Sequence, residues 1–172
     1  MRQVDKHTAL VVLDVQAGLE WMATKLFKNF YPGTFADIVA NSQKLVDDFE
    51  KKGVPVVLVT VSPSFFPHSI REKFAKKRVI SDSAYQILKH SGDVFDQAEL
   101  MKLFKQLEIS QVIFTGFSAD NAVIKAYRSS RKNGLEPIVV KDAVGAKSQK
   151  IYEDVFAEIK NTVMTNQLLY GE

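Results

Sequence analysis

Four short apolar runs constrain the fold of this chain more than any other feature of its sequence. They are TALVVLD (residues 8–14), VPVVLVTV (54–61), QVIFTG (111–116) and EPIVVKDA (136–143). Each is rich in β-branched residues and lacks the alternation with polar residues that a half-exposed strand shows. Such runs are typical of strands covered on both faces, as in a parallel sheet. Residues 85–89 and 162–165 are weaker candidates for a fifth and a sixth strand.

Apolar residues at 3-and-4 spacing predict helices between these strands. The clearest stripe runs over residues 35–49, with Thr34 and Asp37 as a capping box and Gly53 just past its end. Strands that alternate with helices predict a three-layer α/β/α sandwich of Rossmann-like type. Further stripes occupy residues 100–107, with Asp96 as a candidate cap, residues 123–132, and residues 152–159.

Length and composition narrow the class of protein. We expect one domain over residues 1–172, because the chain has 172 residues, 46% of them apolar. No apolar run is long enough to span a membrane, and we expect no membrane partner and a cytoplasmic location. The chain has no cysteine, which excludes disulfides, thiolate metal sites and thiol catalysis. The net charge of +3 does not by itself imply nucleic acid.

Three positions follow predicted strands, at the edge where doubly wound sheets bind ligands. Asp14 ends the first run and is a candidate general acid or base, although a loop cap is the plainer interpretation. Lys89 ends the candidate strand 85–89 and either partners an acid or is simply exposed. The turn at Gly116 leads into a helix whose first N–H groups suit an anion, or is an ordinary connection.

Taken together, these segments resemble the isochorismatase-like (cysteine hydrolase) superfamily over nearly the whole chain. ALVVLDVQAGL resembles its first strand and Asp-x-Gln motif, and ILKHSGDVFDQAEL resembles its catalytic-lysine segment. VIFTGFSADNAVIKAYRSSRKNGLEPIVVKDAV resembles its nucleophile segment and the strand that follows. Each motif is weak alone, but three in order are fairly specific.

The resemblance implies a six-stranded parallel sheet and a site built from three positions. These are Asp14, Lys89 and Ala122, where the cysteine members carry Asp, Lys and a nucleophilic Cys. In those members the Asp activates the thiol and backbone N–H groups hold the oxyanion. A cis peptide bond between Phe117 and Ser118 is also implied.

The departures from the family pattern decide what chemistry remains. Ala122 has no nucleophile, and neither Ser118 nor Asn121 sits at its helical position. The family's SAF-like triplet reads DVF here and places Asp93 near the site. Where metal-binding members carry Asp-x-His, this chain offers Ser62 and Ser64. His68 alone lies nearby, so we expect no metal and no cofactor.

Four functional hypotheses follow. The first is a hydrolase of a small molecule in which Asp14 and Lys89 act with water, as in true isochorismatases, which cleave an enol ether. The second is a catalytically silent binding homologue. The third is a small-amide hydrolase whose Cys has been changed to Ala at position 122. The fourth is nucleic-acid binding through REKFAKKR and YRSSRK. A solvated face explains these basic residues better, because a second basic stripe is absent, and we expect no nucleic-acid partner.

Three of the six residues expected to contact a substrate are aromatic, which suits a planar or ring-shaped ligand, although core packing explains each aromatic as well. A homo-oligomer is expected from the resemblance alone. Residues 63–78, with two prolines and a basic run, are expected to form an irregular flap beside the site. The candidate substrate-binding residues are Gln16, Trp21, Phe95, Phe117, Ser118 and Asn121.

Overall fold

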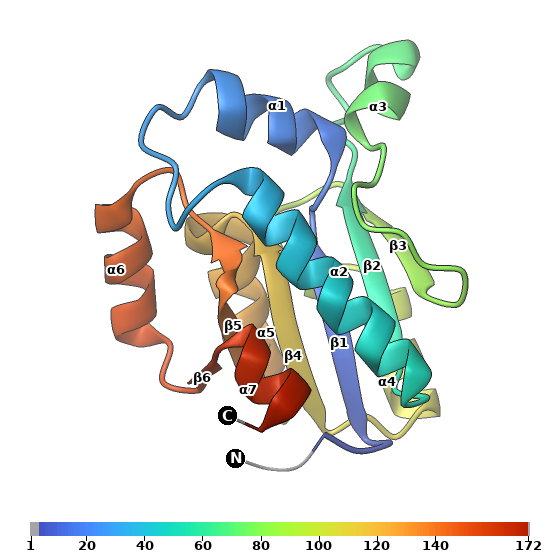
Figure 1. The fold of residues 1–172 in the computed structure, drawn as a ribbon. Helices are drawn as coiled ribbons and strands as arrows, with labels where there is room; N and C mark the ends of the chain where they lie inside the picture. The colour runs from blue at the N-terminus through green and yellow to red at the C-terminus, as the bar shows by residue number, and fades with distance from the viewer. Residues whose placement is uncertain (1–3, 172) are drawn as a thin grey trace.

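A six-stranded parallel sheet in the order β3-β2-β1-β4-β5-β6 forms the centre of the protein (Figure 1). The structure is a computed structural model and describes residues 4–171. The predicted α/β/α class and the six-stranded parallel sheet are confirmed. The strands are β1 (Thr8–Leu13), β2 (Val56–Val61), β3 (Tyr85–Lys89), β4 (Gln111–Phe117), β5 (Glu136–Gly145) and β6 (Thr162–Val163).

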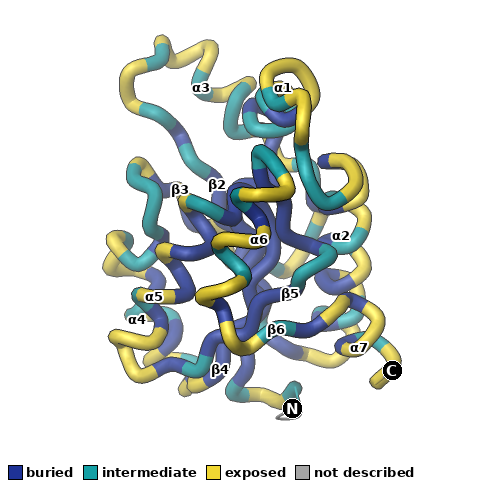
Figure 2. The backbone as a smooth tube through the Cα atoms, turned by 90° about the vertical axis from the view of Figure 1, so that its left-hand side faces the viewer, coloured by how far each residue is buried: buried dark blue, intermediate teal, exposed yellow. Residues whose placement is uncertain are grey.

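Helices cover both faces of the sheet, which explains why its central strands show no polar alternation. One face packs against α2 and α7, with α1 above them, and the other face packs against α4, α5 and α6 (Figure 1). Buried backbone therefore runs through the middle of the molecule, with exposed turns of helix outside it (Figure 2). The helices are α1 (Ala17–Lys25), α2 (Phe35–Lys51), α3 (His68–Phe74), α4 (Ala98–Gln106), α5 (Ile124–Lys132), α6 (Gln149–Glu158) and α7 (Thr165–Tyr170), with short turns η1 (Val94–Asp96) and η2 (Ala119–Val123).

The predicted capping box at the start of α2 is confirmed. The Thr34 hydroxyl accepts the Asp37 N–H at 3.2 Å, and the Asp37 carboxylate accepts the Thr34 N–H at 2.7 Å. These bonds satisfy N–H groups that a helix start leaves without intrahelical partners. The buried stripe of α2 then lies on the sheet from Phe35 to Phe49.

Gly116 sets how closely β4 approaches β1 near the site. It pairs with Leu13 and has a φ of 121°, a conformation that side chains rarely adopt. A Cβ atom at this position would lie 1.9 Å from the Leu13 carbonyl oxygen. Only glycine therefore lets the ends of the two strands lie at this separation.

Two local predictions are wrong. The segment expected to be irregular contains helix α3, none of whose residues is buried, so it has no apolar stripe to reveal it. Asp96 does not cap α4: it belongs to η1, and Gln97 precedes the helix instead. The Asp96 carboxylate accepts the Ser91 hydroxyl at 2.7 Å.

Candidate active site

Asp14 and Lys89 form a buried ion pair at the carboxyl ends of β1 and β3. The Lys89 ammonium lies 2.7 Å from Asp14 Oδ2 and donates to the Gly92 carbonyl at 3.0 Å. The side chain of Lys89 is only 1% exposed, and that of Asp14 is 5% exposed. Asp14 has a φ of 56° and donates its N–H to Val59 on β2 at 2.9 Å. Strand β2 lies between the two strands, so the long lysine side chain reaches across it to the carboxylate.

The environment of Asp14 favours its protonated form more than water does. Burial raises the pKa of its carboxyl group from 3.8 to about 6, and the charge and hydrogen bond of Lys89 limit the rise. Within residues 4–171, Asp14 Oδ1 is buried and has no hydrogen-bond partner. One carboxylate oxygen of Asp14 is therefore held by Lys89, and the other has no partner among the described residues.

Asp14 and Lys89 lie in the wall of a cavity of about 330 Å³. This volume is at the small end of the range for ligand pockets. The wall combines polar side chains from the strand ends with apolar ones from α1 and the loop that follows it. It is lined by Asp14, Leu19, Met22, Phe27, Val61, Pro63, Ser64, Phe65, Lys89, His90, Ser91, Gly92, Phe117, Ser118, Asn121 and Lys147.

The turn after β4 forms another part of this wall. The Phe117–Ser118 peptide bond is cis, as the resemblance implied. The chain then makes a π-helical turn, η2, in which the Val123 N–H donates to the Ser118 carbonyl at 3.1 Å. π-helical turns are frequent at functional sites. Ala122, in this turn, is 1% exposed and packs in the apolar core beneath the cavity wall.

The structure brings five of the nine predicted site residues to the cavity: Asp14, Lys89, Phe117, Ser118 and Asn121. Phe117 packs its ring against Phe27 and Phe30, with ring centres 6.1 and 5.7 Å apart.

The other four predicted residues lie outside the lining of the cavity, Ala122 among them. Gln16 is fully buried, and its amide donates to the Val61 carbonyl at 2.9 Å and accepts the Val61 N–H at 2.8 Å, so it fastens β2 to the start of α1. Trp21 is 56% exposed and lies in an apolar groove between α1 and α3. Phe95 packs against Phe104 in the core. The aromatic type of Trp21 and Phe95 did not distinguish packing from ligand contact.

Sequence reasoning missed His90 and Lys147. His90 directly follows Lys89, and its Nδ1 lies 3.0 Å from the Ser62 carbonyl oxygen. Lys147 lies two residues beyond the end of β5, at the same edge of the sheet. The rule that selected Asp14, applied to the strand that ends at Gly145, would have found Lys147.

Asp93 and His68 have local roles. The Asp93 carboxylate accepts the Phe95 N–H at 3.0 Å and a hydrogen bond from the Ser129 hydroxyl. His68 is exposed at the start of α3, with Glu72 as its nearest acidic neighbour. Among residues 4–171, no group of three or more His, Cys, Asp and Glu side chains is arranged to hold a metal ion. In the same part of the chain, no helix is long and apolar enough to cross a bilayer.

The fold and the site together define a protein with the architecture of an α/β/α hydrolase. The isochorismatase domain matches residues 8–167, and the chain belongs to the isochorismatase family. The resemblance drawn from the motifs is thereby confirmed at the level of the family.

Known relatives agree with this assignment. An uncharacterized isochorismatase family protein of Bacillus subtilis, YrdC, is 26% identical over 161 residues, which cover 89% of this chain and 81% of the relative. An isochorismatase family protein from Burkholderia thailandensis superposes with a TM-score of 0.83 at 19% identity, over 96% of this chain and 95% of that one. A pyrazinamidase of Pyrococcus horikoshii, solved with zinc, gives 0.78 at 19% identity, over 92% and 99%. At these identities the two solved structures establish the fold alone.

Proposed function

We propose that the protein is a hydrolase of a small molecule in which Asp14 and water carry out the chemistry, with Lys89 as the partner of Asp14. The observation that carries the proposal is that Asp14, which lines the cavity, has a buried carboxylate oxygen, Oδ1, without a hydrogen-bond partner among residues 4–171. A pKa of about 6 places this group close to neutral pH, where it can both give and take a proton.

The environment of position 122 supports water as the nucleophile. The Ala122 side chain is a methyl group that packs in the core and is 1% exposed. A methyl group forms no covalent intermediate with an acyl or alkyl substrate. The reaction must then pass through a species that water attacks directly.

Hydrolysis of an enol ether meets this requirement. Protonated Asp14 transfers its proton to the terminal carbon of the C=C bond, and the ether oxygen shares its lone pair to form an oxocarbenium ion. Water adds to the other carbon of the former double bond, the one that carries the ether oxygen, and returns a proton to Asp14. The resulting hemiketal then breaks its C–O bond to release an alcohol and a ketone. The Lys89 ammonium stabilises the Asp14 carboxylate that exists between the two proton transfers.

The buried methyl at position 122 also favours a second candidate, a binding protein on the same fold with no turnover. In that case the cavity retains a ligand and Asp14 is a fixed polar contact. Turnover, or its absence, separates the two candidates.

The test compares the wild-type protein with Asp14→Asn on isochorismate and simpler enol ethers. Loss of a general acid lowers rates by about 10²–10⁴-fold, and we expect a fall of that order. Asp154→Asn is the matched control, because Asp154 is an exposed residue of α6 paired only with Lys150. In heavy water the ketone should carry one deuterium at the protonated carbon. Equal rates for the wild-type protein and Asp14→Asn would sink the proposed mechanism, and ligand-induced stabilisation without turnover would favour the binding protein.

A further inference from the structure

The charged groups around the cavity are unbalanced toward positive charge. Asp14 and Lys89 compensate each other at 2.7 Å. Of the remaining lining residues, Lys147 carries a permanent charge, and no second carboxylate lines the wall. The side chains that line the wall therefore carry a net positive charge, more so when Asp14 is protonated, and the Asp120 carboxylate, 3.6 Å from Lys147 Nζ, offsets it in part. Such a wall attracts anions from solution.

Lys147 is held so that its ammonium group stays available. Its Nζ atom lies 5.5 Å from the centre of the Phe27 ring, which limits where the side chain swings. Its nearest carboxylate oxygen is Asp120 Oδ2, 3.6 Å away, which is beyond hydrogen-bond distance. The side chain is 41% exposed. A ligand that enters the cavity can thus reach the donors of this ammonium without first breaking a tight ion pair.

The groups beside Lys147 suit a particular shape of anion. Phe27 packs on Phe117, with ring centres 6.1 Å apart, and both rings line the cavity. An apolar or ring-shaped body can lie along these two rings with its acidic group at Lys147. Ser118 and Asn121, on the turn after β4, add hydrogen-bonding groups in the same wall.

We propose that the cavity takes a small carboxylic acid with a flat apolar body, and that Lys147 is the residue that binds its carboxylate. The inference rests on the proposed hydrolase function and specifies its substrate class. It assigns Lys147 to binding, while Asp14 and Lys89 carry the chemistry. A carboxylate at Lys147 also disfavours the ionised form of Asp14, so the substrate helps to keep the acid protonated.

The test measures binding of benzoate and of its neutral analogue benzamide by titration calorimetry near neutral pH. For the wild-type protein we expect benzoate to bind roughly tenfold more tightly, as one charge-assisted hydrogen bond predicts. Lys147→Met should remove this preference by weakening benzoate binding and leaving benzamide binding unchanged. Lys150→Met is the matched control, because Lys150 lies three residues further on, is 83% exposed, pairs with Asp154 and does not line the cavity.

A second variant distinguishes a direct effect on binding from a loss of folded protein, because it is expected to raise the affinity for benzoate. Asp120→Asn removes the carboxylate that competes for Lys147, so benzoate should bind more tightly than to the wild-type protein. This gain should vanish in the double variant with Lys147→Met. A wild-type protein that binds both probes equally or neither of them, or a preference that persists in Lys147→Met, would overturn the proposal.

The same titrations distinguish this inference from the proposed reaction. Asp14→Asn should keep the preference for benzoate even though it loses turnover. If the Lys147 variants do not change benzoate binding as expected while hydrolysis still depends on Asp14, only the proposed substrate class is wrong. If benzoate binding depends on Lys147 but no hydrolysis depends on Asp14, Lys147 remains an anion-binding residue and the proposed reaction is wrong.

Discussion

At the scale of single residues, Asp14 combines two requirements that usually conflict. A buried carboxylate needs a positive partner to be tolerated, and Lys89 provides one at 2.7 Å. A general acid needs its proton to be held near neutral pH, and burial raises the pKa of Asp14 to about 6 despite that partner. Lys89 pairs with one carboxylate oxygen of Asp14, and the other has no hydrogen-bond partner among residues 4–171.

The first residue-level prediction concerns the pH dependence of turnover. If protonated Asp14 is the acid, kcat should be highest below about pH 6 and should fall as pH rises through the pKa of Asp14. Lys89, His90 and Lys147 are the other ionisable side chains in the cavity lining. The measurement is kcat against pH on an enol ether. A rate that rises through pH 6 would instead make Asp14 a base.

The second residue-level prediction concerns how the free energy of unfolding depends on pH. The folded-state pKa of Asp14 lies above its unfolded value of 3.8, so this group favours the folded state below about pH 4. That contribution is lost as pH rises through about 6. Lys89→Met removes the one partner that the charged form of Asp14 has among residues 4–171. We expect a loss of about 3–5 kcal/mol in the free energy of unfolding near pH 8, and a smaller loss near pH 5 where Asp14 holds its proton.

Urea unfolding at the two pH values measures this difference. Lys52→Met is the control, because Lys52 pairs with Asp48 at 2.6 Å on the surface, with the lysine side chain 46% exposed. Surface pairs contribute about 0–1 kcal/mol, so this variant should change little at either pH. If Lys89→Met lowers the free energy of unfolding equally at both pH values, the loss does not come from the unpaired charge of Asp14.

At the scale of elements, the site depends on how β4 lies against β1. The Leu13–Gly116 pair is the last in their register, immediately before Asp14 on one strand and Phe117 on the other. The close approach at Gly116 thus fixes the acid relative to the turn that carries Ser118.

Gly116→Ala should be among the most damaging substitutions in the chain. The added Cβ would lie 1.9 Å from backbone, and φ at this position is 121°, so β4 must move. We expect a loss of at least about 4 kcal/mol, or no folded protein. Gly134→Ala is the matched control: its φ is 76°, but a Cβ there would meet nothing within 4 Å. It should cost only about 1–2 kcal/mol of backbone strain, and thermal unfolding compares the two.

The sequence predicted elements whose own residues carry a pattern. The capping box of α2 is present, because a local cap leaves a clear signature in the sequence. Strand 85–89 matches β3, although only Ile87 and Lys89 of this strand are buried, which is why its signal was weaker than that of the central strands. Helix α1 was missed, since Gln16 precedes it without a side-chain cap and its apolar stripe is weak. Helix α3 buries no residue and so leaves no stripe at all.

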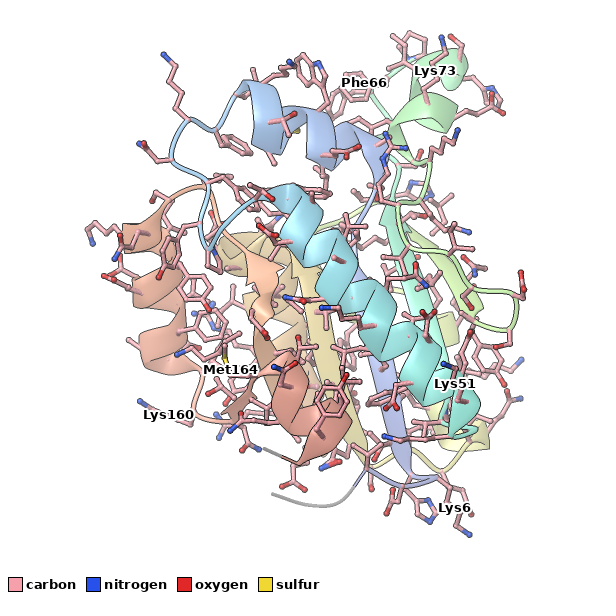
Figure 3. All side chains as sticks on the ribbon, viewed as in Figure 1. Lys6, Lys51, Phe66, Lys73, Lys160 and Met164 are labelled. Carbon is pink, nitrogen blue, oxygen red and sulfur yellow. The ribbon has the colours of Figure 1, made fainter. Side chains whose placement is uncertain are left out.

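The site was predictable where chemistry follows a strand end. Asp14 and Lys89 were found by that rule and meet across β2. Trp21 lies in the groove between α1 and α3 and outside the cavity lining. Which of the two an aromatic side chain of α1 faces depends on the rotation of the helix, which the sequence does not show. Phe66 and Lys73, which also line that groove, lie at the upper edge of the molecule beside α1 and α3 (Figure 3).

At the scale of the whole molecule, the positive charge of the chain is spread over separate places. The basic run from Arg71 to Arg78 begins in α3, which lies beside α1 (Figure 1). On α5, Arg128 donates to the Glu158 carboxylate at 2.7 Å, and Arg131 lies over the Tyr127 ring. The basic residues of α5 are therefore engaged in local contacts, and they do not form one continuous stripe with the run from Arg71 to Arg78.

We therefore expect no measurable affinity for DNA or RNA duplexes or single strands, even at low salt. Binding to nucleic acid needs a continuous row of cations that displaces counterions from successive phosphates. Fluorescence anisotropy with labelled oligonucleotides measures this, and the net charge of +3 makes low ionic strength the most demanding condition. Binding that weakens steeply with added salt would show that the two basic regions act together.

The left-handed backbone at Asp14 has an evolutionary consequence. With φ at 56°, the position admits Asp, Asn and Gly at little cost, while branched side chains are strained there. Asn and Gly are each one nucleotide change away from Asp. A lineage can thus discard the acid in a single mutational step while its scaffold survives. Under the proposed function, the residue at position 14 would distinguish descendants that are enzymes from descendants that keep the fold and only bind a ligand.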